Sequence, residues 1–284
     1  MSQSLPKISI VTPSFNQGPY VEEALQSVKE QNYPAIEHIV VDGASTDGTV
    51  EILKRYAGTP GWEHLRWISE PDDGQTDALN KGFRMVNGEI VGWLNSDDRY
   101  RPGCFAAVVR GFAEQEEIDV LYGDYTWMNE KGRIKRIRRE IEFDRFILSY
   151  YRVLYIATVS TFFRCRLFEE NNWLDGRFEY AMDYEFFLRL ASKGYNFRHL
   201  RSVLADFRWH SQSKSTALPQ KQVAEHNAIA TMYSPILQRV QGTSYQAVTL
   251  AAFRVAAAGL RYWKKLVYGC YLPDFQANDS SPAR

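Results

Sequence analysis

The chain of 284 residues is 45% apolar and 24% charged, so it is long enough and apolar enough to bury a full globular core. Its 34 lysine and arginine residues balance its 34 aspartate and glutamate residues. This balance disfavours a nucleic-acid-binding protein, because that class usually carries an excess of positive charge.

Cysteine usage and hydropathy exclude further classes. The three cysteines are far apart in the chain, so neither a disulfide framework nor a cysteine-rich metal site is expected. The N-terminal residues lack the basic-then-apolar layout of a signal peptide. No uncharged apolar run reaches the roughly 18 residues that a membrane-spanning helix needs. We therefore expect a cytoplasmic protein.

Apolar β-branched runs alternate with segments of helical periodicity from the N-terminus to residue 125. The expected strands are 7–12, 36–41, 65–69, 90–94 and 120–125, and the expected helices are 20–29, 47–56, 76–86 and 102–113. This order is typical of an α/β fold with a mostly parallel central sheet flanked by helices. Sheets of this kind bind ligands at the carboxyl ends of their strands.

The pattern changes after residue 125. A hairpin is expected at 127–137, a strand at 155–163, a helix at 184–192, and a strand pair or one long strand at 197–207. Helical sequence begins at Pro219, which predicts a C-terminal helical extension. The expected organisation is a main domain, 1–217, with a nucleotide-binding half at 1–125 and an acceptor half at 126–217. An extension at 218–275 and a flexible tail at 276–284 follow it.

Polar and acidic residues follow each of the first four expected strands. They are Thr12, Pro13 and Asn16 after the first strand, Asp42 after the second, Glu70 after the third, and Asp97 and Asp98 after the fourth. Each cluster alone is compatible with a turn or a helix cap. Together they place several carboxylates at one edge of the sheet, which is unfavourable unless a cation or a donor-rich ligand compensates them.

Asp97 and Asp98 are the strongest candidates for a metal site. Two adjacent carboxylates directly after a buried strand suit a hard divalent cation, Mn²⁺ or Mg²⁺. The alternative is a turn that caps the helix beginning near Pro102.

The motifs from Ile8 to Asp98 resemble the nucleotide-binding half of inverting family-2 glycosyltransferases, which have the GT-A fold. The matching strings are ISIVTPSFN, IVVDGASTDGT, the strand end with Glu70, GQTDALNKG and GWLNSDD, in family order and spacing. The resemblance continues through 182–190 and 207–210, and it covers roughly residues 7 to 215. An ordered set of this kind is far more specific than any one motif.

The resemblance implies roles for individual residues. Asp42 is expected to contact the nucleobase, Thr12, Pro13 and Asn16 to line the base and ribose pocket, and Asp97 to lie near the ribose and donor sugar. Asp98 would be the direct metal ligand, with His210 completing the metal or diphosphate site unless it is purely structural. The donor-sugar or phosphate region would include Glu70, Asp77, Lys81, Arg208 and Lys214.

Two positions depart from the family pattern. The acidic signature often begins with an aspartate, where this chain has Asn95. The usual Glu-Asp pair at the later site is Met182-Asp183 here, which leaves Asp183 as the candidate catalytic base. A helix cap is the alternative role for Asp183.

The implied function is inverting transfer of a sugar from a nucleoside diphosphate, with uridine diphosphate favoured, to a hydroxyl of a glycan or lipid-linked acceptor. Such a reaction would serve bacterial-type surface polysaccharide or glycan assembly. A sugar-nucleotide-binding module without activity is the alternative. A nucleotidyltransferase is disfavoured, because residues 12–18 do not form a glycine-rich triphosphate loop with basic residues.

The C-terminal extension has no acidic residue between Glu225 and Asp274. Its cations, including Arg261, Lys264 and Lys265, alternate with Tyr262 and Trp263. Basic residues beside interfacial aromatics are typical of a helix at a membrane surface, and contact with the inner face of a membrane is one interpretation. The favoured alternative is a helix packed on its own domain or on a second subunit in a homodimer.

Overall fold

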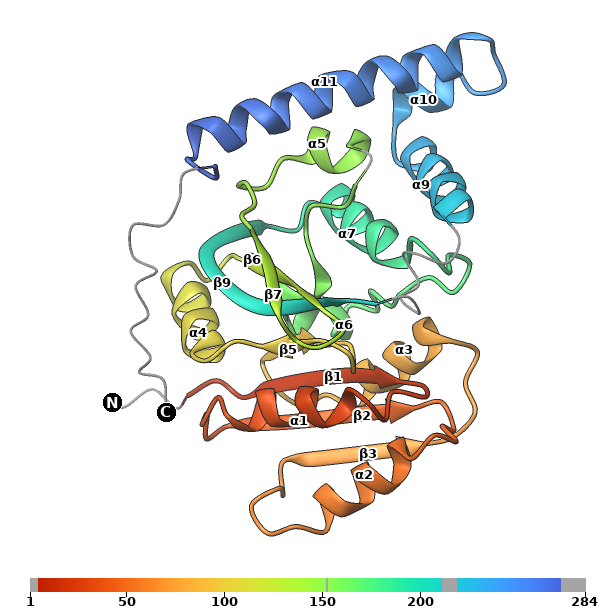
Figure 1. The fold of residues 1–284 in the computed structure, drawn as a ribbon. Coiled ribbons are helices and arrows are strands. Elements are labelled where there is room, and N and C mark those ends of the chain that lie inside the picture. The colour runs from red at the N-terminus through yellow and green to blue at the C-terminus, as the bar shows by residue number, and fades with distance from the viewer. Residues whose placement is uncertain (1–4, 152, 211–218, 272–284) are drawn as a thin grey trace.

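The computed structural model describes residues 5–151, 153–210 and 219–271 of the chain (Figure 1). Within these ranges it has the predicted α/β fold, in which a curled central sheet is flanked by helices. The N-terminal strands lie at one end of the molecule and helix α11 (Tyr245–Val267) lies at the other (Figure 1). Within the described residues, no helix is both long enough and apolar enough to cross a bilayer.

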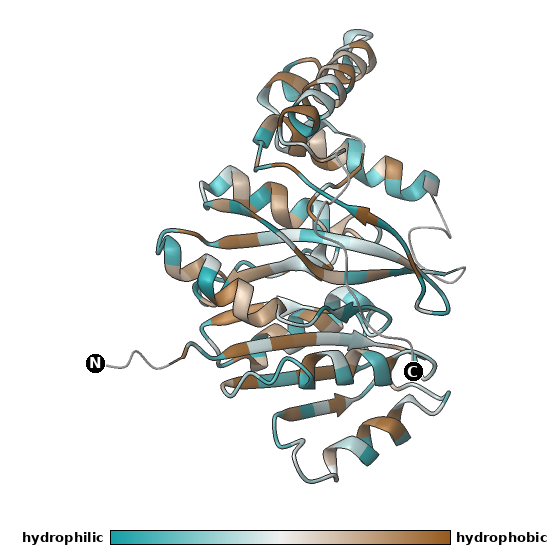
Figure 2. Ribbon diagram, turned by 60° about the vertical axis from the view of Figure 1, so that its left-hand side comes forward, coloured by the Kyte–Doolittle hydropathy of each residue, from teal (hydrophilic) through white to brown (hydrophobic). Residues whose placement is uncertain are grey.

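The N-terminal half is a parallel sheet centred on β1. Its strands are β1 (Ile8–Ser14), β2 (Ile36–Asp42), β3 (Leu65–Ser69) and β4 (Ile90–Trp93). The register pairs Ile8 with both Ile36 and Ile90, so the strands begin level with one another. Because they also run the same way, their carboxyl ends meet at one edge. The strands are hydrophobic along most of their length (Figure 2), as expected for a sheet covered on both faces.

The predicted helices of this half are present with ends shifted by a few residues. They are α1 (Val21–Lys29), α2 (Thr49–Ala57), α3 (Gln75–Met85) and α4 (Cys104–Glu114). Helix α3 approaches β1 closely because Gly82 has no side chain; a Cβ there would lie 2.4 Å from Val11 Cγ1. This close approach holds the first turn of α3 near the carboxyl edge of the sheet.

The second half of the sheet is mixed in direction. Strand β8 (Thr161–Arg164) pairs antiparallel with both β4 and β6 (Val120–Asn129), and β6 pairs in parallel with β9 (Phe197–Trp209). The strand order is β3-β2-β1-β4-β8-β6-β9-β5, where β5 is Arg99–Tyr100, and β7 (Ile134–Arg138) pairs with β6. The N-terminal strands and β9 are therefore parts of one sheet.

Short elements account for the differences from the sequence prediction. The strand expected at 155–163 begins only at Thr161, because Thr158–Ser160 forms a 3₁₀ turn (η1). The predicted hairpin is present as β6 and β7, and residues 197–207 belong to one continuous strand. Helices α5 (Arg145–Tyr150) and α6 (Arg166–Glu169) were not expected, since so few residues carry little helical periodicity.

Helix α7 (Met182–Lys193) is packed on several sides at once. Phe186 and Phe187 are fully buried and lie 5.6 Å and 6.1 Å from the ring of Phe163 on β8. Aromatic packing of this kind leaves the helix little freedom to move. The residues of its first turn are therefore held rigidly.

The predicted helical extension is present as α9 (Pro219–Met232), α10 (Pro235–Arg239) and α11. Arg261 and Lys265 of α11 point inward to the buried Glu140, at 2.5 Å and 3.2 Å, and Lys264 lies 2.5 Å from Asp144. These three cations thus stabilise the attachment of α11 to the domain. They do not form the cationic outer face on which the prediction of membrane contact was based.

We predict that Glu140→Ala lowers the free energy of unfolding by about 3–5 kcal/mol, because it leaves Arg261 and Lys265 buried without their carboxylate. Urea denaturation followed by circular dichroism would measure the change. Glu114→Ala is the matched control, since its pair with Arg198 is partly exposed to solvent and should contribute about 1 kcal/mol or less. Equal losses in the two variants would contradict this assignment.

Candidate active site

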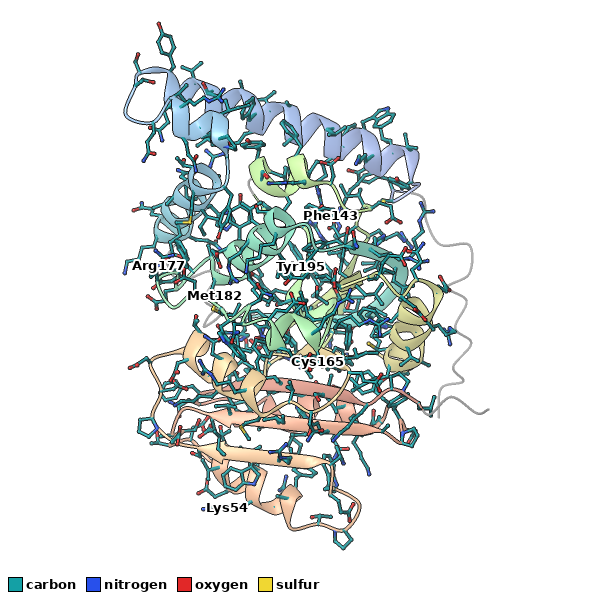
Figure 3. All side chains as sticks on the ribbon, turned by 180° about the vertical axis from the view of Figure 1, so that it is seen from behind. Lys54, Phe143, Cys165, Arg177, Met182 and Tyr195 are labelled. Atoms are coloured by element: carbon teal, nitrogen blue, oxygen red, sulfur yellow. The ribbon has the colours of Figure 1, made fainter. Side chains whose placement is uncertain are left out.

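The carboxyl ends of the N-terminal strands and the start of α7 meet at one edge of the molecule. Gln75, at the start of α3, donates to Asn95 Oδ1 at 2.9 Å. The next residue, Thr76, contacts the sulfur of Met182, which directly precedes Asp183. Met182, the first residue of α7 and labelled in Figure 3, accordingly lies beside the start of α3. The structure therefore brings the acidic loop at 95–98 and Asp183 to the same region.

Asn95 organises the acidic loop. Its Oδ1 accepts hydrogen bonds from Gln75 Nε2 and Trp93 Nε1, both at 2.9 Å, and its Nδ2 donates to Asp98 Oδ2 at 3.2 Å. A carboxylate at this position could not donate to Asp98 and would repel it. Asn95, which stands where the family's acidic signature often has an aspartate, therefore suits the hydrogen-bonding groups around it.

Asp98 is turned into the protein. It is 1% exposed, and its Oδ1 accepts a hydrogen bond from the backbone N–H of Arg208 at 2.7 Å. Burial, followed by the charge of Asp97, holds the pKa of Asp98 well above its ordinary value. The role of Asp98 as direct metal ligand stays a prediction. In this structure Asp98 joins the acidic loop to β9.

Asp97 is the more exposed of the two aspartates, and the buried His210 lies beside it. Asp97 Oδ2 lies 2.9 Å from His210 Nε2, and the Asp97 side chain remains 21% exposed. In the part of the chain that the structure describes, no group of three or more histidine, cysteine or acidic side chains is arranged to hold a metal. One carboxylate and one imidazole still fit a divalent cation that takes its remaining ligands from water and a diphosphate.

Arg208, which the sequence predicts for the phosphate region, is a buried residue whose guanidinium contacts other parts of the protein. It is 1% exposed, and its guanidinium donates to the backbone oxygens of Asp97 and Glu130 at 2.7 Å and 2.8 Å. It also pairs with Glu23 at 2.7 Å. All of its nitrogens are therefore engaged in holding the acidic loop and the β6–β7 turn together.

Thr12 and Pro13, predicted to line the base and ribose pocket, point their side chains into the interior. Thr12 is fully buried, and its hydroxyl lies 2.8 Å from His38 Nε2. Burial lowers the pKa of His38 to about 3, so this histidine is neutral. The buried Thr12 and Pro13 therefore shape the edge without offering their side chains to a ligand.

Asp42 is also fully buried. Its carboxylate accepts hydrogen bonds from Ser45 N at 2.9 Å, Ser45 Oγ at 2.5 Å and Ser69 Oγ at 2.7 Å. The exposed Asn16 completes this arrangement, because its Oδ1 accepts from Thr46 N at 2.9 Å. In this conformation Asp42 holds the loop after β2 in shape, and its contact with a base stays a prediction.

Glu70, Asp77 and Lys81 form one ion-pair cluster beside the start of α3. Lys81 Nζ lies 2.9 Å from Glu70 Oε1 and 3.1 Å from Asp77 Oδ2. All three side chains are partly exposed. Lys214, also predicted for the phosphate region, lies outside the described residues.

Asp183 lies in the first turn of α7 and is partly buried. Its Oδ1 accepts a hydrogen bond from the backbone N–H of Tyr184 at 2.8 Å. Burial raises the pKa of Asp183 to about 6, and the charge of Glu225 adds to the rise. A carboxylate with a pKa close to neutrality can accept a proton far more readily than an ordinary aspartate.

Glu225 is a positioning residue that the sequence analysis missed. From α9 its carboxylate accepts the backbone N–H groups of Glu179, Tyr180 and Ala181 at 3.1 Å, 2.8 Å and 2.8 Å. Beside it, the ring of His226 stacks at 4.4 Å on that of Tyr184. The only signal in the sequence was that Glu225 is the last acid before a long stretch without any.

A hollow of about 700 Å³ elsewhere on the molecule is lined in part by Arg84, Arg164 and Arg166, beside Cys165, which is labelled in Figure 3. These cations are already engaged, with the rings of Trp173 and Phe112 and with the carboxylate of Asp119, respectively. None of the predicted site residues lines this hollow. The candidate active site is therefore the carboxyl edge of the sheet.

Two solved structures share this fold. Staphylococcus aureus TarS 1–349, in complex with UDP-GlcNAc, superposes with a TM-score of 0.61 at 17% identity, covering 88% of this chain and 79% of that one. The mannosyltransferase PcManGT from Pyrobaculum calidifontis, in complex with GDP-Man and Mn²⁺, gives a TM-score of 0.58 at 19% identity, covering 93% and 89%. At these identities the similarity concerns the fold alone.

Relatives at higher identity cover most of the chain. An uncharacterized glycosyltransferase of Mycobacterium tuberculosis is 34% identical over 191 residues, which are 66% of this chain and 70% of the relative. The Bacillus subtilis protein TuaG, named as a teichuronic acid biosynthesis glycosyltransferase, is 27% identical over 222 residues, 76% and 84% of the two chains. The family model for glycosyl transferase family 2 matches residues 9–172, more than half of the chain. The chain therefore belongs to glycosyltransferase family 2.

Proposed function

We propose that this glycosyltransferase transfers a sugar, with inversion, from a nucleoside diphosphate to a hydroxyl of a glycan or lipid-linked acceptor. The observation that carries the proposal is the placement of Asp183. Its carboxylate has a pKa raised to about 6, and its helix is joined through Met182 and Thr76 to the helix that contacts the acidic loop. Asp183, as the base for the acceptor hydroxyl, and the acidic loop, as the site for the diphosphate, would then both lie at the carboxyl edge of the sheet.

The relatives support the class of donor and product. TarS binds UDP-GlcNAc and PcManGT binds GDP-Man, and these two complexes support a nucleoside diphosphate sugar as the donor here. We favour a uridine diphosphate sugar. The name of TuaG supports a role in assembling a bacterial surface polysaccharide. Asp97, Asp98 and Asp183 are all present, and the hydrogen bonds of the acidic loop are formed, so an inactive binding module is not favoured.

Asp97 and His210 are the residues that would hold a divalent cation, Mn²⁺ or Mg²⁺. PcManGT with its Mn²⁺ supports this cofactor, and an oxygen and a nitrogen ligand 2.9 Å apart fit it. A bound cation would neutralise the negative charge that develops on the departing diphosphate. Asp98 and Arg208 would act indirectly, by holding the loop that presents Asp97.

The chain's own residues then account for a single displacement. Asp183 accepts the proton of the acceptor hydroxyl while its oxygen forms a bond to the anomeric carbon. The bond from that carbon to the diphosphate oxygen breaks, and the nucleoside diphosphate leaves with the electron pair. Attack opposite the leaving group inverts the configuration. Packing of α7 and the contacts of Glu225 keep Asp183 in position throughout.

Replacement of the base tests the assignment. We predict that Asp183→Asn lowers kcat by about 10²- to 10⁴-fold while the donor still binds. The variant should also gain up to about 3 kcal/mol of unfolding free energy at pH 8, because the native fold no longer holds a carboxylate whose pKa is raised by roughly two units. Nucleoside diphosphate release and thermal unfolding would measure the two effects. Retained turnover would remove Asp183 from the mechanism.

The pH dependence of kcat tests the environment of Asp183. We predict that kcat falls as the pH drops below about 6, because protonated Asp183 cannot accept the hydroxyl proton. Glu225→Gln should lower kcat about tenfold, since one of its backbone contacts is lost, and should move the acidic limb to lower pH by removing a neighbouring negative charge. A purely structural Glu225 would leave the midpoint of the limb unchanged.

The metal assignment distinguishes two adjacent residues. We predict that Asp97→Asn loses the thermal stabilisation that Mn²⁺ adds to uridine diphosphate binding, whereas Asp98→Asn keeps it. Glu51→Gln, on an exposed position of α2, is the control for loss of a negative charge. If only the Asp98 variant lost the stabilisation by Mn²⁺, Asp98 would be the direct metal ligand, as the sequence predicts.

A further inference from the structure

The outward face of α11 is apolar along its whole length. Large side chains on it are well exposed, among them Val248 at 67% and Val255 at 74%. The exposed positions at alternating spacings of three and four residues are Tyr245, Val248, Ala252, Val255, Gly259, Tyr262 and Leu266. Monomeric proteins rarely leave a continuous apolar surface of this length open to water. We call this set of residues the α11 seam.

No charged residue of α11 is on that face. Its four cations are Arg254, Arg261, Lys264 and Lys265, and all are buried or partly buried. Arg261, Lys264 and Lys265 pair with Glu140 and Asp144, as described above. Arg254 donates to Asn227 of α9. The helix therefore places its charge against the domain and its apolar residues toward solvent.

This distribution argues against a membrane surface as the occupant. A helix that lies on an anionic bilayer carries its lysines and arginines beside the apolar face, where they reach the headgroups. The side chains of Arg261, Lys264 and Lys265 are only 9%, 20% and 8% exposed, and their charge is compensated inside the domain. Among the described residues of its helix, the α11 seam therefore has no free cations beside it that could attract anionic lipid headgroups.

The spacing of the seam favours another helix. Apolar positions separated by three and four residues form the contact line of paired helices, because they stay on one side over successive turns. The centre of the seam is small, with Ala252 and Gly259 on either side of Val255, while larger residues lie toward both ends. Small central residues let two helices approach closely where they cross.

We propose that the α11 seam pairs with the seam of a second copy of this chain, with the two helices antiparallel. The two-fold axis would pass near Val255, so that Val248 of one copy faces Tyr262 of the other. A helix of 23 residues is roughly 35 Å long. A contact of that length, widened by the exposed Trp263 and Val267, is compatible with the roughly 600 Å² per partner of the smaller stable interfaces.

The pairing would leave the candidate active site accessible. Figure 1 shows α11 at the opposite end of the molecule from β1, β2 and β3, with α5 and the second half of the sheet between them. Helix α9, which carries Glu225, precedes α10 and α11 in the chain. A dimer through the seam would therefore anchor the extension that supports Asp183 without covering the edge where a donor would bind.

Sedimentation equilibrium of the full chain tests the proposal. We expect a dimer for the wild-type protein, and a monomer for Val255→Glu at the same concentration, because two carboxylates would meet at the axis. The control is Ile134→Glu, which alters an equally apolar residue that is 47% exposed on β7 and should remain dimeric. Unchanged thermal unfolding would show that the Val255 variant is folded. A monomeric wild type, or a dimeric Val255→Glu variant, would overturn the proposal.

Cysteine cross-linking tests the direction of the helices. Under mild oxidation, Val255→Cys should form a disulfide-linked dimer, whereas Tyr245→Cys should not, since two copies of that position lie far apart in an antiparallel pair. The wild-type chain controls for its own cysteines. Cross-linking of both variants would indicate parallel helices and contradict the antiparallel arrangement. Binding of a monomeric wild type to phosphatidylglycerol vesicles, abolished by Val255→Glu, would assign the seam to lipid instead.

Discussion

The candidate site depends on the contact between the end of β9 and the acidic loop after β4. The Arg208 backbone donates to Asp98 and its guanidinium donates to the Asp97 backbone, both at 2.7 Å, across 110 residues of sequence or more. Both side chains that make this contact are nearly inaccessible to water. Buried polar groups are stable only when their hydrogen bonds are satisfied, and the partners of Asp98 and Arg208 therefore fix the loop in one conformation. Asp97 and His210 are presented by this fixed frame.

The other side of the site is supported by elements that are remote in sequence. Helix α7 presents Asp183 because its aromatic residues pack against β8, and Glu225 of α9 holds the backbone just before it. The C-terminal extension is therefore part of the catalytic domain's support. Its last helix uses buried ion pairs to attach itself and leaves an apolar face outside. The C-terminal extension thus contains both Glu225, which supports the proposed base Asp183, and the α11 seam, through which two copies are proposed to pair.

Local patterns in the sequence were enough to predict the parallel N-terminal half, the helices between its strands and the family. These features depend on local periodicity and on motifs within a few residues of each strand end, and both can be read directly along the chain. For the same reason, the carboxyl edge could be named as the site, since parallel strands must end together. Short elements such as η1 and α5 were missed, because a few residues carry too little pattern.

Which polar side chains remain open to a ligand depends on contacts that form when the chain folds. Thr12, Asp42, Asp98 and Arg208 match family motifs, yet each is buried and engaged by partners far away in the chain. The same holds for the cations of α11, which look like a membrane-facing set until Glu140 and Asp144 are seen beneath them. Sequence patterns describe the chemistry that a side chain can perform. Whether the side chain is open to a ligand depends on long-range contacts, which leave no trace in local spacing.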